Sequence, residues 1–289
     1  MIQHYLTAAW SWLSDVVGST AGTIGLSSLG CIVLLVFMVS ILSNLKLSYH
    51  QDYSRTSREA NLLALGYLPI RESGAYWNDP TGSGLEDNKK AEIAATYNLR
   101  TGNDAFNLVV ELLEFRARRD NWQKLLDIRA RGTEANGGRK PAIETWLADA
   151  KSGGALGRSG EQEFIESIER YEQQLGSRYF PPREPVTSLD GYALGLAVAI
   201  SNWSVGLGLM GEAESLALIE QANELARKEF ESWEDFARSF ILGRAIHLSG
   251  GSFNQEQLKR ARKGIELMTQ AMDNESPGAW YQLPWQLPA

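Results

Sequence analysis

The sequence predicts an all-α protein with an N-terminal single transmembrane helix followed by a multi-helix cytoplasmic domain. Residues 24–42, IGLSSLGCIVLLVFMVSIL, carry no charged side chain. From residue 52 onward apolar residues recur with the helical period, and no stretch alternates Val, Ile or Thr as a strand would. The 289 residues are enough for one large or two small domains with a full core.

Residues 24–47 are the predicted membrane anchor. The uncharged run, as a helix, would rise about 28 Å, close to the roughly 30 Å hydrocarbon core of a bilayer. No Lys or Arg precedes it, whereas Lys46, Arg55 and Arg58 follow it. The positive-inside rule then places the N-terminus outside and the C-terminal domain in the cytoplasm. For a bacterial protein this topology predicts a single pass through the inner membrane. A cleaved signal peptide is the main alternative, and the missing basic residues and cleavage site disfavour it.

The segment before the anchor, residues 1–23, is rich in aromatic residues and is expected to lie at the membrane interface. Gly18 and Gly22 have the GxxxG spacing that lets two membrane helices approach closely. We therefore keep a homodimer through Gly18 and Gly22 as one interpretation. A simple hinge between the interfacial segment and the anchor is the preferred one.

The rest of the chain divides into a helical region at 52–176 and a second helical block at 180–289, separated by the proline-rich FPPREP at 180–185. Whether the two form one domain or two is open. Helices are expected at 55–68, 86–100, 103–131, 141–146, 161–175, 189–209, 212–230, 232–249 and 255–273. Two starts carry capping residues, Ser232 followed by Asp235 and Asn254 followed by Gln257.

Three stretches carry a family resemblance: LGLAVAISNWSVGLGLMGEAESLALIEQA at 194–222, FESWEDFARSFILGRAIHLSGG at 230–251, and SPGAWYQLPWQL at 276–287. With these, residues 180–289 resemble the bacterial domain of unknown function numbered 1266, and 52–131 do so only loosely. The resemblance implies a helical domain and no established activity. Relatives often carry an Asp and an Arg where this chain has Ala193 and Leu196, so no catalytic residue is transferred.

Composition excludes several chemistries. The net charge of −7 argues against nucleic-acid binding, which needs a basic surface. The single cysteine, Cys31, lies within the predicted anchor, and the three histidines are far apart in sequence. No metal or cofactor is therefore expected. Glu166, Glu169 and Glu172 have the spacing of a solvated charged face on their helix.

The candidate binding residues lie in the last third of the chain. Arg244 is expected on or beside the apolar stripe of its helix, either as an anion-binding residue or, preferably, in an ion pair to a neighbouring helix. The other candidates are Arg238, His247, Trp233, Trp280 and Trp285. The aromatic C-terminal segment should not be helical, because prolines interrupt it, and we expect it to dock onto the domain or to contact a partner.

The leading hypothesis is a membrane-anchored helical protein-interaction module, immunity-like or a scaffold. A basic protein partner is expected, because the domain is acidic. The alternative is an enzyme or effector that acts on a nucleotide or other phosphate ligand through Arg238 and Arg244. An envelope sensor is a third hypothesis. A cleft joining Arg244 to two or more buried carboxylates would favour the enzyme, and catalysis is the less favoured class.

Overall fold

The computed structural model describes residues 49–114, 121–157, 160–274 and 278–287, and every regular element in these ranges is a helix. In chain order they are α3 (Arg58–Leu63), η1 (Ala64–Gly66), α4 (Tyr67–Glu72), α5 (Asp87–Thr96), α6 (Gly102–Glu114), α7 (Trp122–Ala135), α8 (Ile143–Ser152), α9 (Glu161–Leu175), α10 (Gly191–Gly206), α11 (Glu212–Glu229), α12 (Trp233–Leu248), α13 (Gln255–Ala271) and α14 (Ala279–Gln282). The predicted all-α class is confirmed for these residues.

The predicted N-terminal anchor lies outside the described residues. The chain divides into two compact units, Met1–Leu47 and Ser48–Ala289. The anchor at 24–47, the aromatic segment before it and the Gly18/Gly22 pair all belong to the first unit. Across the part of the chain that the structure describes, no helix is both long and apolar enough to cross a membrane. The anchor therefore stays a prediction.

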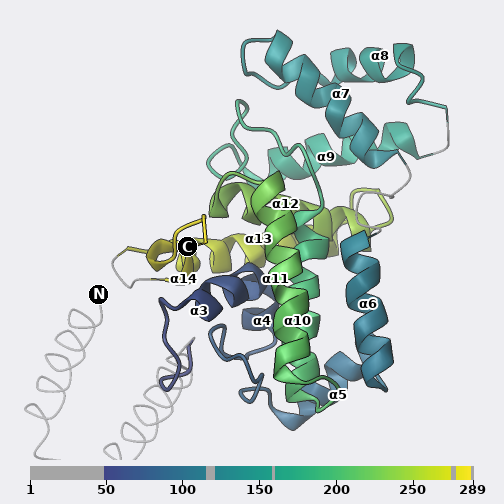
Figure 1. Ribbon diagram of the computed structural model, residues 1–289. Coiled ribbons are helices and arrows are strands. Elements are labelled where there is room, and N and C mark those ends of the chain that lie inside the picture. Colours follow the sequence, from purple (N-terminus) through teal and green to yellow (C-terminus); the bar gives the residue numbers. More distant parts are fainter. Residues whose placement is uncertain (1–48, 115–120, 158–159, 275–277, 288–289) are drawn as a thin grey trace, which may run out of the picture. The chain divides into compact units, whose positions relative to one another are not determined.

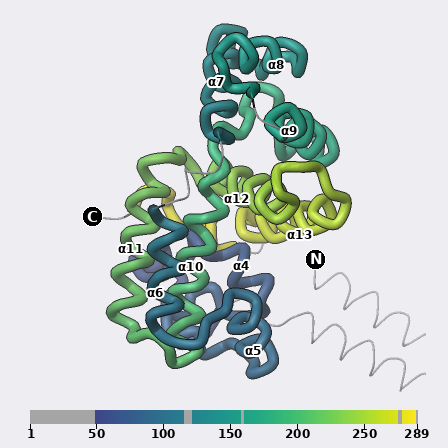
Figure 2. The backbone as a smooth tube through the Cα atoms, turned by 90° about the vertical axis from the view of Figure 1, so that its right-hand side faces the viewer, coloured from purple at the N-terminus to yellow at the C-terminus, as the bar shows by residue number. Residues whose placement is uncertain are grey.

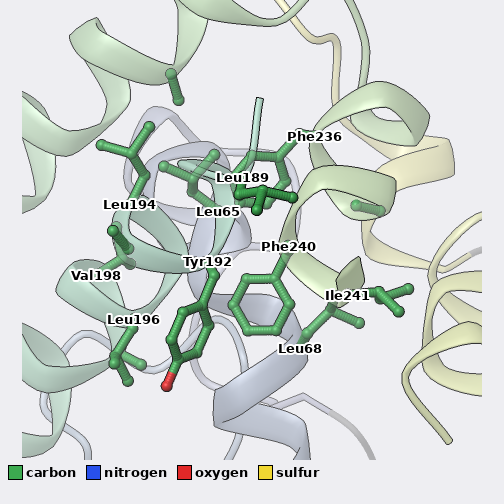
Figure 3. Packing of buried hydrophobic residues seen from close by; sticks show 14 of the residues in the cluster. Leu65, Leu68, Leu189, Tyr192, Leu194, Leu196, Val198, Phe236, Phe240 and Ile241 are labelled. Atoms are coloured by element: carbon green, nitrogen blue, oxygen red, sulfur yellow. The ribbon is translucent and has the colours of Figure 1, made fainter. Parts of the chain in front are cut away.

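Helix α10 is the central element of the second unit (Figures 1 and 2). Every residue from Gly191 to Ser204 is buried, because α10 packs against α3, η1, α4, α6, α11 and α12. A helix that is apolar on all sides is expected to be surrounded by other helices in this way. Figure 3 shows the resulting core, in which the ring of Tyr192 lies beside that of Phe240 with centroids 5.6 Å apart.

Glycines allow α10 and α12 to cross closely. A Cβ atom on Gly195 would lie 2.8 Å from the ring of Phe240, and one on Gly243 would lie 2.4 Å from the backbone oxygen of Leu189. Either distance is shorter than real side chains tolerate. The two glycines therefore set how near the central helix lies to the helix that carries Arg244.

Helices α7, α8 and α9 pack on one another, and α9 connects them to α12 and α13. A buried ion cluster joins α7 to α9. Arg129 donates to Glu172 at 2.6 and 3.0 Å and to Glu169 at 2.6 Å, and Lys140 bonds both carboxylates at 3.0 Å. The expectation of a solvated face was wrong for Glu169 and Glu172, since the Glu172 side chain is 2% exposed. Only Glu166 is exposed.

Several expected helix boundaries differ from the structure. The helix expected over 103–131 is not continuous, because Asn121 has a left-handed φ of 71° immediately before α7. The first helix does not stop at Gly66 or Pro69, since η1 and α4 follow α3 directly and Pro69 falls in the first turn of α4, where a proline costs no hydrogen bond. The two predicted caps are confirmed: Ser232 Oγ accepts from the Asp235 amide, and Asn254 Oδ1 accepts from the Gln257 amide.

Candidate functional site

A cleft of about 810 Å³ opens beside α10. This volume is in the range of pockets that bury a small ligand. Its apolar wall consists of Ile93, Leu108, Leu112, Leu196, Trp203 and Phe240. Its polar lining includes Glu72, Lys89, Glu92, Tyr97, Glu111, Tyr192, Arg244, His247 and Arg260. Helices α4, α5, α6, α10, α12 and α13 each contribute to it, so the cleft exists only when the unit is folded.

Arg244 is the central polar residue of this cleft. Its Nη1 donates to Glu72 Oε2 at 2.5 Å, which joins α12 to the C-terminal end of α4. The two side chains are 21% and 17% exposed. This is the ion pair to a neighbouring helix that the sequence favoured. The surroundings of Arg244 are nevertheless not a filled core, because the pair lines an open cleft.

Tyr97 lies close to this pair. Burial raises the pKa of Tyr97 to about 12, with a further rise from Tyr192 and from Glu72 and an opposing effect of Arg244. Tyr97, Glu72 and Arg244 line the same cleft. A tyrosine hydroxyl is protonated at neutral pH, and the raised pKa of Tyr97 keeps it a hydrogen-bond donor at alkaline pH as well.

His247 lines the same cleft one turn beyond Arg244, with its ring centroid 5.5 Å from that of Tyr192. Arg238 does not line the cleft. It is buried on α12, and its Nη1 donates to Glu184 Oε2 at 2.7 Å. The structure therefore brings Arg244 and His247 together and places Arg238 in a separate ion pair.

The three candidate tryptophans meet in a second cluster. Trp233 and Trp280 stack with centroids 5.4 Å apart and planes at 8°, and Trp285 meets Trp233 edge-on at 4.9 Å. The guanidinium of Arg227 lies over Trp233 and Trp285, at 4.4 and 4.0 Å from their centroids. Burial lowers the pKa of Arg227 to about 9, which still leaves it charged at neutral pH. Cation–π contact with two rings favours that charge.

Each indole of this cluster donates to a backbone carbonyl: Trp233 to Leu283, Trp280 to Ala64 and Trp285 to Phe230, all at 2.8 or 2.9 Å. The expectation that the C-terminal segment docks onto the domain is confirmed for residues 278–287. The expectation that it holds no helix was wrong. One turn, α14, fits between the prolines at 277 and 284.

Sequence reasoning missed Glu72, Tyr97 and the apolar wall of the cleft. Glu72 and Arg244 are 172 residues apart, and no local pattern pairs them. Leu196 lines the cleft as an apolar side chain, and Ala193 is buried. In the described ranges, no group of three or more His, Cys, Asp or Glu side chains is arranged to hold a metal ion.

A family model described as "Protein of unknown function (DUF1266)" matches residues 84–285. The chain belongs to this family. The match begins well before residue 180, so it includes α5 to α9 as well as the later helices that carry the recognisable motifs. No curated protein matches the chain, and no solved structure does.

Proposed function

We propose that this chain is a membrane-held recognition module and that the cleft around Arg244 is its binding site. The observation that carries the proposal is the cleft itself, in which an apolar wall lies next to the part-buried Arg244–Glu72 pair. Small-ligand sites combine such walls with a few converging polar groups. Leu248 supports this reading, because it lines the cleft yet is 44% exposed.

Recognition fits the lining better than catalysis does. Acid–base chemistry requires carboxylates in different environments, with one shifted by burial. Among the cleft carboxylates, Glu72 is only partly buried and paired with Arg244, and Glu92 and Glu111 are exposed. The alternative of a phosphate-acting enzyme loses one of its two arginines, since Arg238 is bound to Glu184 outside the cleft.

The proposed location and the proposed partner rest on the sequence. We propose that residues 24–47 anchor the chain in the bacterial inner membrane with the helical unit in the cytoplasm, as the uncharged run and the following Lys46, Arg55 and Arg58 indicate. The acidic composition favours a basic protein partner, as an immunity-like or scaffold protein would have. In that case the cleft is the place where the partner, or a ligand that controls it, binds.

The test is site-specific photo-crosslinking in the native cells. A photoreactive phenylalanine analogue replaces either Leu248, at the cleft, or Phe106, which is also exposed but does not line the cleft. We expect a reproducible adduct from position 248 and not from position 106, and the intact mass distinguishes a protein from a small molecule. Equal labelling at both positions, or none, contradicts the proposal. Fractionation of the same cells tests the anchor, because a chain without residues 1–47 should leave the membrane fraction.

A further inference from the structure

We propose that the cleft binds a small zwitterion with an apolar side chain, in chemical terms an apolar α-amino acid. This inference rests on the proposed function, because it names the ligand class of the same site. It starts from the two charges at its centre, Arg244 and Glu72, which contact each other and are both only partly exposed.

A neutral ligand matches the charge of the lining. The basic residues Lys89, Arg244 and Arg260 are balanced by the acidic residues Glu72, Glu92 and Glu111. With His247 neutral, the formal charge of the lining is zero. A cleft built for an anion such as a nucleotide would instead carry an excess of arginine or lysine.

The ion pair itself distinguishes a zwitterion from a simple anion. An anion that takes the guanidinium of Arg244 away from Glu72 leaves a part-buried carboxylate without its partner, which is costly. A zwitterion avoids this cost. Its carboxylate accepts from the remaining donors of Arg244 while its ammonium group donates to the free oxygen of Glu72, so four charges alternate around a ring. The protonated hydroxyl of Tyr97 is a further donor for the ligand carboxylate.

The apolar wall supplies the place for the side chain. Ile93, Leu112 and Trp203 are buried lining residues from three different helices, and Leu248 is an exposed apolar residue at the same cleft. Contact with an apolar group would remove the exposed surface of Leu248 from water, and burial of apolar area contributes roughly 25 cal/mol per Å². Charge recognition and apolar contact thus lie side by side, as an apolar amino acid requires.

The first experiment compares four probes by calorimetry on the purified full-length chain. They are L-phenylalanine, N-acetyl-L-phenylalanine without the ammonium group, L-phenylalaninamide without the carboxylate, and glycine without the apolar side chain. We expect L-phenylalanine to bind at least about tenfold more tightly than each of the others, or about 1.4 kcal/mol. Equal or tighter binding of the N-acetyl compound would identify an anion site and overturn the inference. Equal binding of the amide, or no binding of any probe, would also overturn it.

The second experiment tests the ion pair. Glu72→Gln and Arg244→Gln should each weaken binding of L-phenylalanine by about tenfold or more, the loss expected when one partner of a charge pair is removed. The double variant with Glu72→Arg and Arg244→Glu should recover it. A matched control is Arg58→Gln, which removes a 2.6 Å pair with Glu220 outside the cleft.

The four-probe comparison uses the unaltered chain, so a variant that fails to fold does not leave the inference untested. Unchanged binding in folded Glu72→Gln and Arg244→Gln chains would contradict it. If position 248 still gives its specific photo-adduct while no zwitterion binds, the cleft remains the recognition site and the ligand class alone is wrong.

Discussion

Glu172 shows how a single residue couples charge to stability in this fold. Burial by itself would raise its pKa, but the charge and hydrogen bonds of Arg129, with those of Lys140, outweigh burial and leave the pKa lowered. For Arg129 burial opposes the charge, yet Glu172 and Glu169 outweigh it and the pKa is raised. Both ions are thus held in the charged state inside the α7–α9 contact.

The cluster makes stability depend on pH. Because the pKa of Glu172 is lower in the folded chain than the value of about 4.3 in an unfolded chain, the contribution of this group is fully present above that value. It is lost as the pH falls through the folded pKa. We expect Glu172→Gln to cost about 3 kcal/mol at neutral pH, because it leaves part of the Arg129 charge uncompensated. Urea unfolding of the full chain, followed by circular dichroism, measures both effects.

The matched control is Glu166→Gln on the same helix. Glu166 is exposed, so Glu166→Gln should change the free energy of unfolding by no more than about 0.5 kcal/mol. If Glu166→Gln and Glu172→Gln lose equal stability, or if the acid loss of stability persists unchanged in Glu172→Gln, the cluster does not have this role.

The glutamates also mark a limit of sequence reasoning at this scale. Glu166, Glu169 and Glu172 share one spacing, and the spacing alone indicates a solvated face. Glu169 and Glu172 differ from Glu166 because they pair with Arg129, which is 43 residues from Glu172 and lies in another helix. A buried arginine on α7 needs a carboxylate partner, but a single sequence does not say which one. Arg244 was singled out because apolar residues surround it in its own helix, whereas its partner Glu72 had no such local signal.

At the scale of elements, the sequence predicts where two helices begin, but it does not predict which helices pack against each other. Ser232 and Asn254 begin α12 and α13 as their hydrogen-bonding chemistry predicts, because a cap depends on residues three positions apart. The central position of α10 depends on six other elements, and its uniform apolar character does not tell which face meets which neighbour. The cleft therefore could not be read from the sequence, since it depends on those same contacts.

The close packing of α12 at Gly243 predicts whether Gly243→Ala raises or lowers the free energy of unfolding. Helix propensity alone would make Gly243→Ala stabilising by about 0.8–1 kcal/mol. The added Cβ would lie 2.4 Å from the Leu189 backbone oxygen, which cannot rotate away. We expect a net destabilisation of about 1–3 kcal/mol, as in other overpacked cores, measured as the free energy of urea unfolding.

A control for this variant is Gly264→Ala in α13. Its added Cβ would approach only the side chain of Ile241, at 3.1 Å, and a side chain can shift by a few tenths of an ångström. Gly264→Ala should therefore lower the free energy of unfolding by less than Gly243→Ala does. A Gly243→Ala chain that is as stable as the wild type would show that α12 can move away from the Leu189 backbone, just before α10, without cost.

At the scale of the whole second unit, the helices before the family match complete both sites. The match starts at residue 84, yet α3, η1 and α4 precede it. They provide Glu72 for the cleft, and Ala64 and Asn61 as partners for the C-terminal segment. Residues from the two ends of the unit therefore meet, and both candidate sites depend on that closure.

Trp280 tests this closure. It is buried, stacks on Trp233 and donates to the Ala64 oxygen at 2.9 Å, so its removal leaves a cavity between the first and last helices of the unit. We expect Trp280→Ala to cost about 3–5 kcal/mol and to lower the melting temperature of the full chain. Its neighbour Tyr281 is 58% exposed in the same helical turn, so Tyr281→Ala should stay within about 0.5 kcal/mol of the wild type. If the two variants have the same melting temperature, the C-terminal segment is not part of the folded core. If only Trp280→Ala lowers the melting temperature, the unit requires both of its ends, and the helices outside the family match belong to the same folded domain.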